Sequence, residues 1–159
     1  MMRRAFMATL LATGLFGGIP PLSAQTPSVM GTWLTASKAA EVQIAPCANA
    51  ANGPICGTIV KLNDPKSPEG KPVTPEEATD VRNADPALRS RKVLGMVLIY
   101  NFVKTTDPNT FEEGTIYNGE NGKTYSANIS LQADGKLRLR GFVGSPMFGE
   151  TQLWTRIGQ

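Results

Sequence analysis

Apolar and polar residues alternate along much of the second half of the chain. In residues 123–132 the apolar Tyr125, Ala127, Ile129 and Leu131 are separated by polar residues. Successive side chains of a β-strand point to opposite faces, so this pattern predicts a strand with one buried and one wet face. The other segments predicted as strands are residues 30–36, 39–46, 55–62, 93–103, 110–117, 136–143 and 147–157.

Turn-forming sequences separate several of these segments. Asn52-Gly53-Pro54, Asn118-Gly119, Asp134-Gly135 and Gly144-Ser145-Pro146 stand where consecutive strands would reverse. Such turns join antiparallel neighbours. The pattern therefore predicts an all-β, up-and-down antiparallel barrel of eight strands, a size that side chains fill or that holds one small ligand.

Residues 63–92 interrupt the strand pattern. The segment contains five prolines and many charges, which exclude a central strand. Within it, Thr74-Pro75-Glu76-Glu77 combines an N-cap residue, proline in the first turn and two acids, which predicts a short helix to about Arg82. The barrel is therefore expected to carry a short helical insert before its fourth strand.

The segment at 93–103 is apolar on both faces. A strand of this kind is covered on both sides. One face is expected to meet the core and the other to meet the insert at 63–92, although a partner protein is an alternative cover.

The N-terminal residues predict a secretory signal. Arg3 and Arg4 precede an uncharged apolar run at 5–19, and small residues lead to a cleavage site after Ala24. The alternative is a membrane anchor, but the run is shorter than the roughly 20 residues that a bilayer needs and glycines and prolines break it. We expect a single domain at 25–159, exported to the periplasm or beyond, with no membrane span after cleavage.

Export changes the charge balance. The chain has 16 basic and 13 acidic residues, and residues 1–24 hold two of the basic ones and no acid. The remaining net charge of about +1 offers no electrostatic footprint for nucleic acid.

Cys47 and Cys56 are the two cysteines of the chain. An even pair in an exported protein predicts a disulfide. The alternative is a redox or metal pair. The spacing differs from the CxxC redox motif, and the absence of histidine excludes a Cys/His zinc site.

Few catalytic arrangements are open to this sequence. Without histidine there is no Ser-His-Asp or Cys-His machinery, and no catalytic residue, cofactor or metal is predicted. Glu112 and Glu113 would face opposite sides of one strand, so a two-carboxylate glycosidase site is disfavoured. A hydrolase is kept as the third function class.

Several short motifs occur in a characteristic order. They are Gly31-Thr32-Trp33, Cys56-Gly57-Thr58-Ile59-Val60, Asp85-Pro86-Ala87-Leu88-Arg89-Ser90-Arg91, Gly114-Thr115-Ile116-Tyr117, Gly122-Lys123-Thr124-Tyr125, Arg140-Gly141-Phe142-Val143-Gly144 and Trp154-Thr155-Arg156. In this order they resemble the domain-of-unknown-function 2147 family of exported bacterial proteins. The resemblance spans residues 30–157 and implies a lipocalin-like barrel, but no established activity. The chain departs from the family where Asn118-Gly119 follows Tyr117, since Asp-Pro is usual there.

Trp33 and Arg156 lie in the first and last predicted strands. In barrels of lipocalin type, a tryptophan and an arginine at these places lock the closed end. We expect the guanidinium to stack on the indole, a contact of roughly 0.5–2 kcal/mol. The alternative is that Trp33 contacts a ligand. The sequence leaves open whether Trp154 and Arg156 or Leu153 and Ile157 point inward.

The leading function hypothesis is binding of a small apolar or amphipathic molecule inside the barrel. The expected lining is Val42, Ile44, Ile59, Tyr125, Ile129, Leu131, Leu137 and Leu139. Arg82, Arg89 and Arg91 are candidate contacts for a charged head group, or else a solvated cluster. The alternative is a structural or protein-interaction module of the cell envelope with a filled barrel and an unknown partner.

Overall fold

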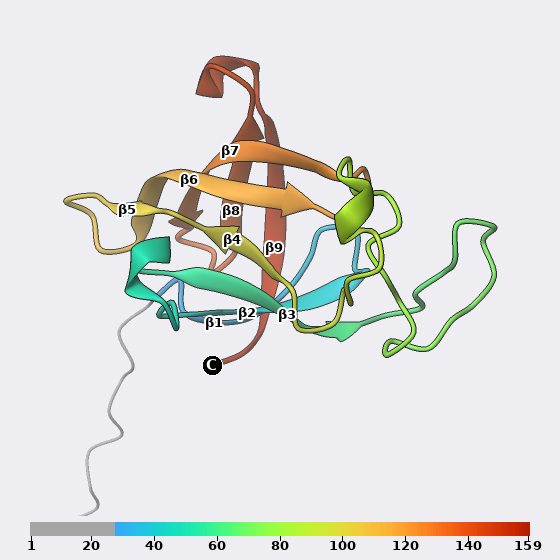
Figure 1. Cartoon of the computed structure of the whole chain (residues 1–159). Coiled ribbons are helices and arrows are strands. Elements are labelled where there is room, and N and C mark those ends of the chain that lie inside the picture. The colour runs from blue at the N-terminus through green and yellow to red at the C-terminus, as the bar shows by residue number, and fades with distance from the viewer. Residues whose placement is uncertain (1–27) are drawn as a thin grey trace, which may run out of the picture.

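The computed structural model describes residues 28–159, so the predicted signal sequence at 1–24 lies outside the described residues. Nine antiparallel strands form one sheet that closes into a barrel (Figure 1). The strands are β1 (Gly31–Leu34), β2 (Ala40–Ala45), β3 (Cys56–Leu62), β4 (Val97–Tyr100), β5 (Val103–Lys104), β6 (Thr110–Asn118), β7 (Lys123–Leu131), β8 (Leu137–Phe142) and β9 (Glu150–Gly158).

The nine strands occupy eight positions around the barrel. β4 and β5 both pair with β6, β4 opposite residues 115–116 and β5 opposite residues 111–112. The two therefore act as one interrupted strand, and the predicted eight-stranded up-and-down barrel is confirmed. Two pairings close the sheet into a barrel. The first strand, β1, pairs with the last strand, β9, and β4 pairs with β6 through Ile99–Ile116 and Tyr100–Thr115.

The alternation of apolar and polar residues determines which side chains point into the barrel. Along β8, Leu137 and Leu139 are buried, and along β7, Ala127 and Ile129 are buried, while Ser126 is exposed. Each strand of such a ladder thus contributes every second residue to one shared core. On β9 the choice that the sequence left open is resolved, because Trp154 is buried and its neighbours on the other face are exposed.

One end of the barrel is packed solid. Phe102 is 2% exposed, and its ring lies so close to Gly114 that a side chain there would collide with it. Gly53 faces the backbone of Phe102 in the same way. We call this end, which also holds Trp33 and the Cys47–Cys56 disulfide, the closed end. The predicted disulfide is confirmed.

The insert between β3 and β4 differs in detail from the prediction. No helix runs from Thr74 to Arg82; a turn forms at Thr74, and the helical part is the 3-10 helix η2 (Pro86–Leu88). Pairing of Thr79 with Lys92 draws the chain into an extended hairpin-like path instead. Within residues 28–159, no helix is long and apolar enough to cross a membrane.

The strand predicted at 93–103 is shorter and broken. Gly95 and Asn101 both adopt positive φ, +83° and +63°, and these residues lie outside β4. A left-handed residue turns the chain out of the extended path. As a result Leu98 and Ile99 are both buried while Val97 is exposed, which simple alternation does not give.

Candidate functional site

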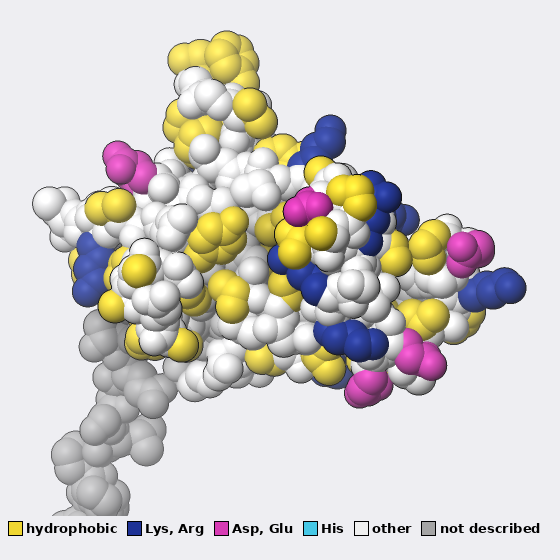
Figure 2. All heavy atoms as spheres, in the orientation of Figure 1, with side chains coloured by type: hydrophobic (Ala, Val, Ile, Leu, Met, Phe, Trp, Pro, Cys, Tyr) yellow, Lys and Arg dark blue, Asp and Glu magenta, His cyan; other side chains and the backbone are white. Residues whose placement is uncertain are grey.

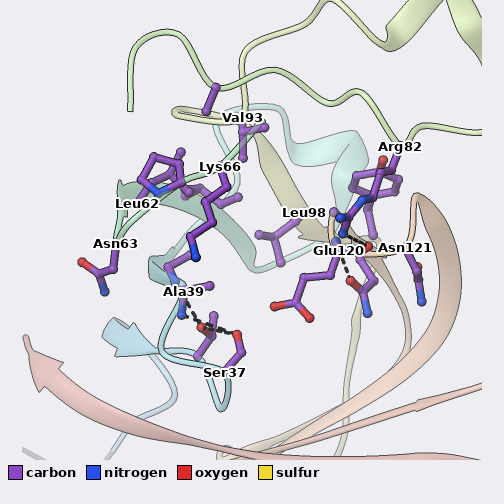
Figure 3. Close-up of a pocket in the computed structure, with 18 of the residues that line it drawn as sticks. Ser37, Ala39, Leu62, Asn63, Lys66, Arg82, Val93, Leu98, Glu120 and Asn121 are labelled. Carbon is purple, nitrogen blue, oxygen red and sulfur yellow. Dashed lines mark hydrogen bonds between the residues drawn. The ribbon is translucent and has the colours of Figure 1, made fainter. Parts of the chain in front are cut away.

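A cavity opens at the end of the barrel opposite the closed end. It has a volume of about 560 Å³. Its lining comes from the β1–β2 turn, the insert, the β6–β7 turn, and the ends of β8 and β9 (Figure 3). In an up-and-down barrel these connections all lie at the same end, so distant parts of the chain form one mouth.

The floor of the cavity is apolar. Buried side chains from six strands meet there, and the 2% exposed Trp154 is the largest of them. The floor consists of Ala40, Ile59, Leu98, Ile116, Leu139 and Trp154. Such a surface gains free energy when it covers the apolar part of a ligand.

The rim of the cavity is polar and carries both signs of charge. Lys66 and Glu120 extend into the space from opposite sides (Figure 3). Arg82 Nη1 donates a hydrogen bond to the carbonyl oxygen of Glu120 at 2.6 Å, which fixes the insert against the β6–β7 turn. The other polar rim residues include Ser37, Asn63, Asn121, Glu150 and Gln152.

A buried polar cluster anchors the insert beside the cavity. The Asp80 carboxylate, fully buried, accepts hydrogen bonds from Tyr117 Oη at 2.5 Å, from Asn83 Nδ2 at 2.8 Å and from Arg91 Nε at 2.8 Å. The Arg91 guanidinium also lies 4.9 Å from the centre of the Tyr117 ring. Burial, and then the hydrogen bond to Asp80, raise the pKa of Tyr117. We call these four residues the Asp80 cluster.

The Asp80 cluster holds the insert on β6, the strand that carries Tyr117. Among residues 28–159, no buried side-chain polar atom lacks a hydrogen-bond partner, so the cost of burying this carboxylate is met within the cluster. A second contact lies at Gly122, in left-handed conformation with φ +72°, where an added side chain would collide with the carbonyl of Arg82.

The two residues predicted at the closed end are in contact. Trp33 and Arg156 are paired across β1 and β9, and the guanidinium lies 4.1 Å from the centre of the indole ring. Trp33 Nε1 donates to the Val29 carbonyl at 2.9 Å, and Arg156 donates to the carbonyls of Met30 and Ser28. Burial lowers the pKa of Arg156. Trp33 is fully buried and does not line the cavity.

The predicted ligand lining divides between the core and the cavity. Ile59, Tyr125 and Leu139 line the cavity. The other predicted lining residues lie deeper or elsewhere in the barrel and do not line it: Val42, Ile44, Ile129, Leu131 and Leu137. The physical reason is packing, because the buried side chains of Trp33, Phe102 and Phe111 occupy the closed half.

The three predicted head-group arginines have different surroundings. Arg82 lies on the rim. Arg89 donates from Nε to the Asn83 carbonyl at 2.8 Å, and Arg91 belongs to the Asp80 cluster, so neither lines the cavity. Sequence reasoning missed Lys66, Glu120 and Gln152, because each stands in a different part of the chain and carries no motif.

Comparison with known proteins agrees with this architecture. The family model described as "Uncharacterized protein conserved in bacteria (DUF2147)" matches residues 31–156. The solved structure of HP1028 from Helicobacter pylori, described as belonging to the lipocalin family, is similar with a TM-score of 0.64 and 20% identity. The match covers 83% of this chain and 84% of that one. No curated protein matches the sequence significantly. At this identity the structural likeness concerns the fold.

Proposed function

The chain belongs to the uncharacterized bacterial family DUF2147, and from that premise we propose that it binds one small amphipathic molecule in the open end of its barrel. The observation that carries the proposal is the cavity of about 560 Å³ with an apolar floor and a polar rim. Small-molecule sites occupy roughly 300–1,000 Å³ and combine these two kinds of lining. The lipocalin-like fold of the barrel supports the same function.

In this proposal the apolar part of the ligand lies on the floor, against Leu98 and Trp154, and its polar group faces the rim. The rim carries charges of both signs: Lys66 and Arg82 are basic, and Asp64, Glu120 and Glu150 are acidic. A neutral or zwitterionic polar group suits such a rim better than a group that requires several positive charges. The site is proposed to bind and not to catalyse, with a packed closed half that limits how deep a ligand can reach.

A ligand series tests this arrangement. Each buried methylene contributes about 0.8 kcal/mol, so affinity should rise about fourfold per added carbon and then level off when the cavity is full. The measurement is displacement of a fluorescent fatty-acid probe by alkyl alcohols of increasing length. Absence of saturable probe binding by the wild-type protein contradicts the proposal and favours the envelope-interaction module instead.

A pair of variants locates the binding. Ala40 is buried on the inner face of β2 and lines the cavity, so Ala40→Phe fills space that the ligand needs. Ser126→Phe adds the same ring on the outer face of β7, where the side chain is exposed. We expect Ala40→Phe to bind the probe at least tenfold more weakly than the wild type and Ser126→Phe to bind it as the wild type does. Equal binding by both variants places the ligand elsewhere.

Export to the periplasm or outside the cell is part of the proposal. The predicted signal sequence supports it, and the Cys47–Cys56 disulfide suits an oxidising compartment. A protein of this kind would take up its ligand outside the cytoplasm.

A further inference from the structure

The connection between β8 and β9 ends in an exposed apolar tip. It comprises residues 143–149 and includes the 3-10 helix η3 (Pro146–Phe148). Val143, Met147 and Phe148 are 73%, 79% and 82% exposed, the three most exposed large apolar side chains of residues 28–159. This tip projects away from the barrel (Figure 1), and the space-filling view shows its apolar side chains at the top of the molecule (Figure 2).

Hydrogen bonds hold the tip in this outward conformation. Arg140 donates from Nε to the Pro146 carbonyl at 2.6 Å, from Nη2 to the Met147 carbonyl at 3.2 Å and from Nη1 to Thr151 Oγ1 at 2.8 Å. Ser145 Oγ accepts from the Met147 amide at 3.3 Å. The backbone is thus braced by polar groups while the apolar side chains stay in solvent, which preorganises them for an external contact.

Two basic side chains lie on the outer face of β8 below the tip, whereas Glu150, the acid at the base of the tip, lines the cavity. Residues 143–149 carry no charge, and Arg138 and Arg140 follow along the outer face of β8. Their cross-strand neighbours on β7 and β9 are uncharged: Asn128, Ser130, Thr151 and Leu153. Within the described residues, neither arginine forms an ion pair with an acidic side chain.

We propose that the 143–149 tip docks the protein on an anionic lipid surface, with Met147 and Phe148 inserted among the lipids and Arg138 and Arg140 facing phosphate groups. A projecting knob needs a concave partner in a protein, whereas a fluid bilayer closes around any convex shape. Apolar side chains below a basic belt are the arrangement of peripheral membrane anchors. The absence of charge in the tip avoids the cost of placing an ion in hydrocarbon.

Docking in this way brings the cavity to the membrane. Gly141 and Glu150, at the base of the hairpin, both line the cavity. An amphipathic molecule could then pass between the lipid layer and the barrel mouth over a short path. Docking itself needs no bound ligand, so its test is independent of the function proposed above.

The test is flotation of the full chain with vesicles of phosphatidylglycerol and phosphatidylethanolamine, compared with vesicles of phosphatidylcholine. We expect the wild-type protein to float with the anionic vesicles. The double variant Met147→Ser, Phe148→Ser should bind at least tenfold more weakly. The matched control is Val97→Ser, Val103→Ser, which removes two exposed apolar side chains from β4 and β5 and should bind as the wild type does.

A second pair of variants tests the basic belt. Arg138→Gln should weaken binding to anionic vesicles about fivefold, since one basic group near such a surface contributes about 1 kcal/mol. Lys136→Gln removes a charge just beyond the other end of β8, beside Asp134, and should have no effect. The proposal is overturned if the wild type does not float, if the tip variant floats equally well, or if removing the tip instead dissociates an oligomer in sedimentation.

Discussion

Asp80 ties the insert to β6 beside the cavity. Its carboxylate is fully buried, and it is stabilised by hydrogen bonds from Tyr117, Asn83 and Arg91. Removing one partner of a buried ion leaves part of its desolvation cost uncompensated. Each member of the Asp80 cluster therefore contributes to stability through the same carboxylate.

Tyr117→Phe should lower the free energy of unfolding by about 1–3 kcal/mol, because Asp80 loses one donor while the ring is kept. The variant should also change how the free energy of unfolding depends on pH above about 10. The pKa of Tyr117 is raised in the folded protein, so above the usual tyrosine pKa of about 10 the unfolded chain loses this proton first. Stability from Tyr117 is complete below that pH and is lost as the pH rises.

Urea unfolding between pH 8 and pH 11 measures this difference. The gap in stability between the wild type and Tyr117→Phe should narrow as the pH rises through the folded-state pKa. A constant gap over that range contradicts the role assigned to the hydroxyl.

Trp33 and Arg156 should stabilise the closed end jointly. Trp33→Ala is expected to cost about 3–5 kcal/mol, since the indole is fully buried, and Arg156→Ala less. Because the two side chains stack at 4.1 Å, a double-mutant cycle should give a coupling energy of about 0.5–3 kcal/mol. A coupling energy of zero in thermal or urea unfolding would show that the contact contributes nothing.

At the scale of elements, the insert and the β6–β7 turn fit closely together. Gly122→Ala should push the insert away, because the new methyl group meets the Arg82 carbonyl. Gly135→Ala is the matched control: this glycine has φ +80°, close to the +72° of Gly122, but open space around it. Both variants share the strain of positive φ, so only their difference reports the contact.

Limited proteolysis measures that difference. We expect cleavage within residues 63–96 to be faster in Gly122→Ala than in Gly135→Ala, with both proteins still folded by circular dichroism. Equal cleavage rates would mean that the insert does not depend on this contact.

The sequence predicted the strands well because alternation is a local property. β7 and β8 lie within one residue of the ranges expected from their apolar positions. The helix expected at Thr74 did not form, since pairing of Thr79 with Lys92 and burial of Asp80 are tertiary contacts that override local propensity. The strand break at Asn101 likewise depends on a left-handed backbone conformation, which is hard to predict from sequence at a residue other than glycine.

The site was predicted less completely than the fold. Inward-facing residues such as Ile129 and Leu137 follow from alternation, but whether they touch a cavity depends on which large side chains fill the barrel. Phe102 and Phe111 fill the closed half, and neither was among the residues expected to line the interior, although one face of the segment at 93–103 was expected to meet the core. The rim residues meet only because the barrel brings its turns together.

At the scale of the whole molecule, the Cys47–Cys56 disulfide cross-links the connection between β2 and β3 at the closed end. Replacing both Cys47 and Cys56 by serine should lower the free energy of unfolding by about 2–3 kcal/mol, because a short loop is freed in the unfolded chain. Urea unfolding measures this loss. The exported protein should also begin at Gln25 and resist thiol labelling, which intact-mass spectrometry checks; an uncleaved mass or two labelled thiols would contradict export as proposed.

The short β4 strand has a kinetic consequence for the closed barrel. It is joined to β6 by two residue pairs, whereas β6 and β7 share seven. Local opening follows the least-bonded part of a structure, so amide hydrogens of β4 should exchange with deuterium well before those of β7 and β8. β5, at the same barrel position, is also joined to β6 by two residue pairs. The barrel then opens sideways between β6 and these two short strands more readily than between β6 and β7, which gives a molecule held inside a lateral route out while the insert stays in place.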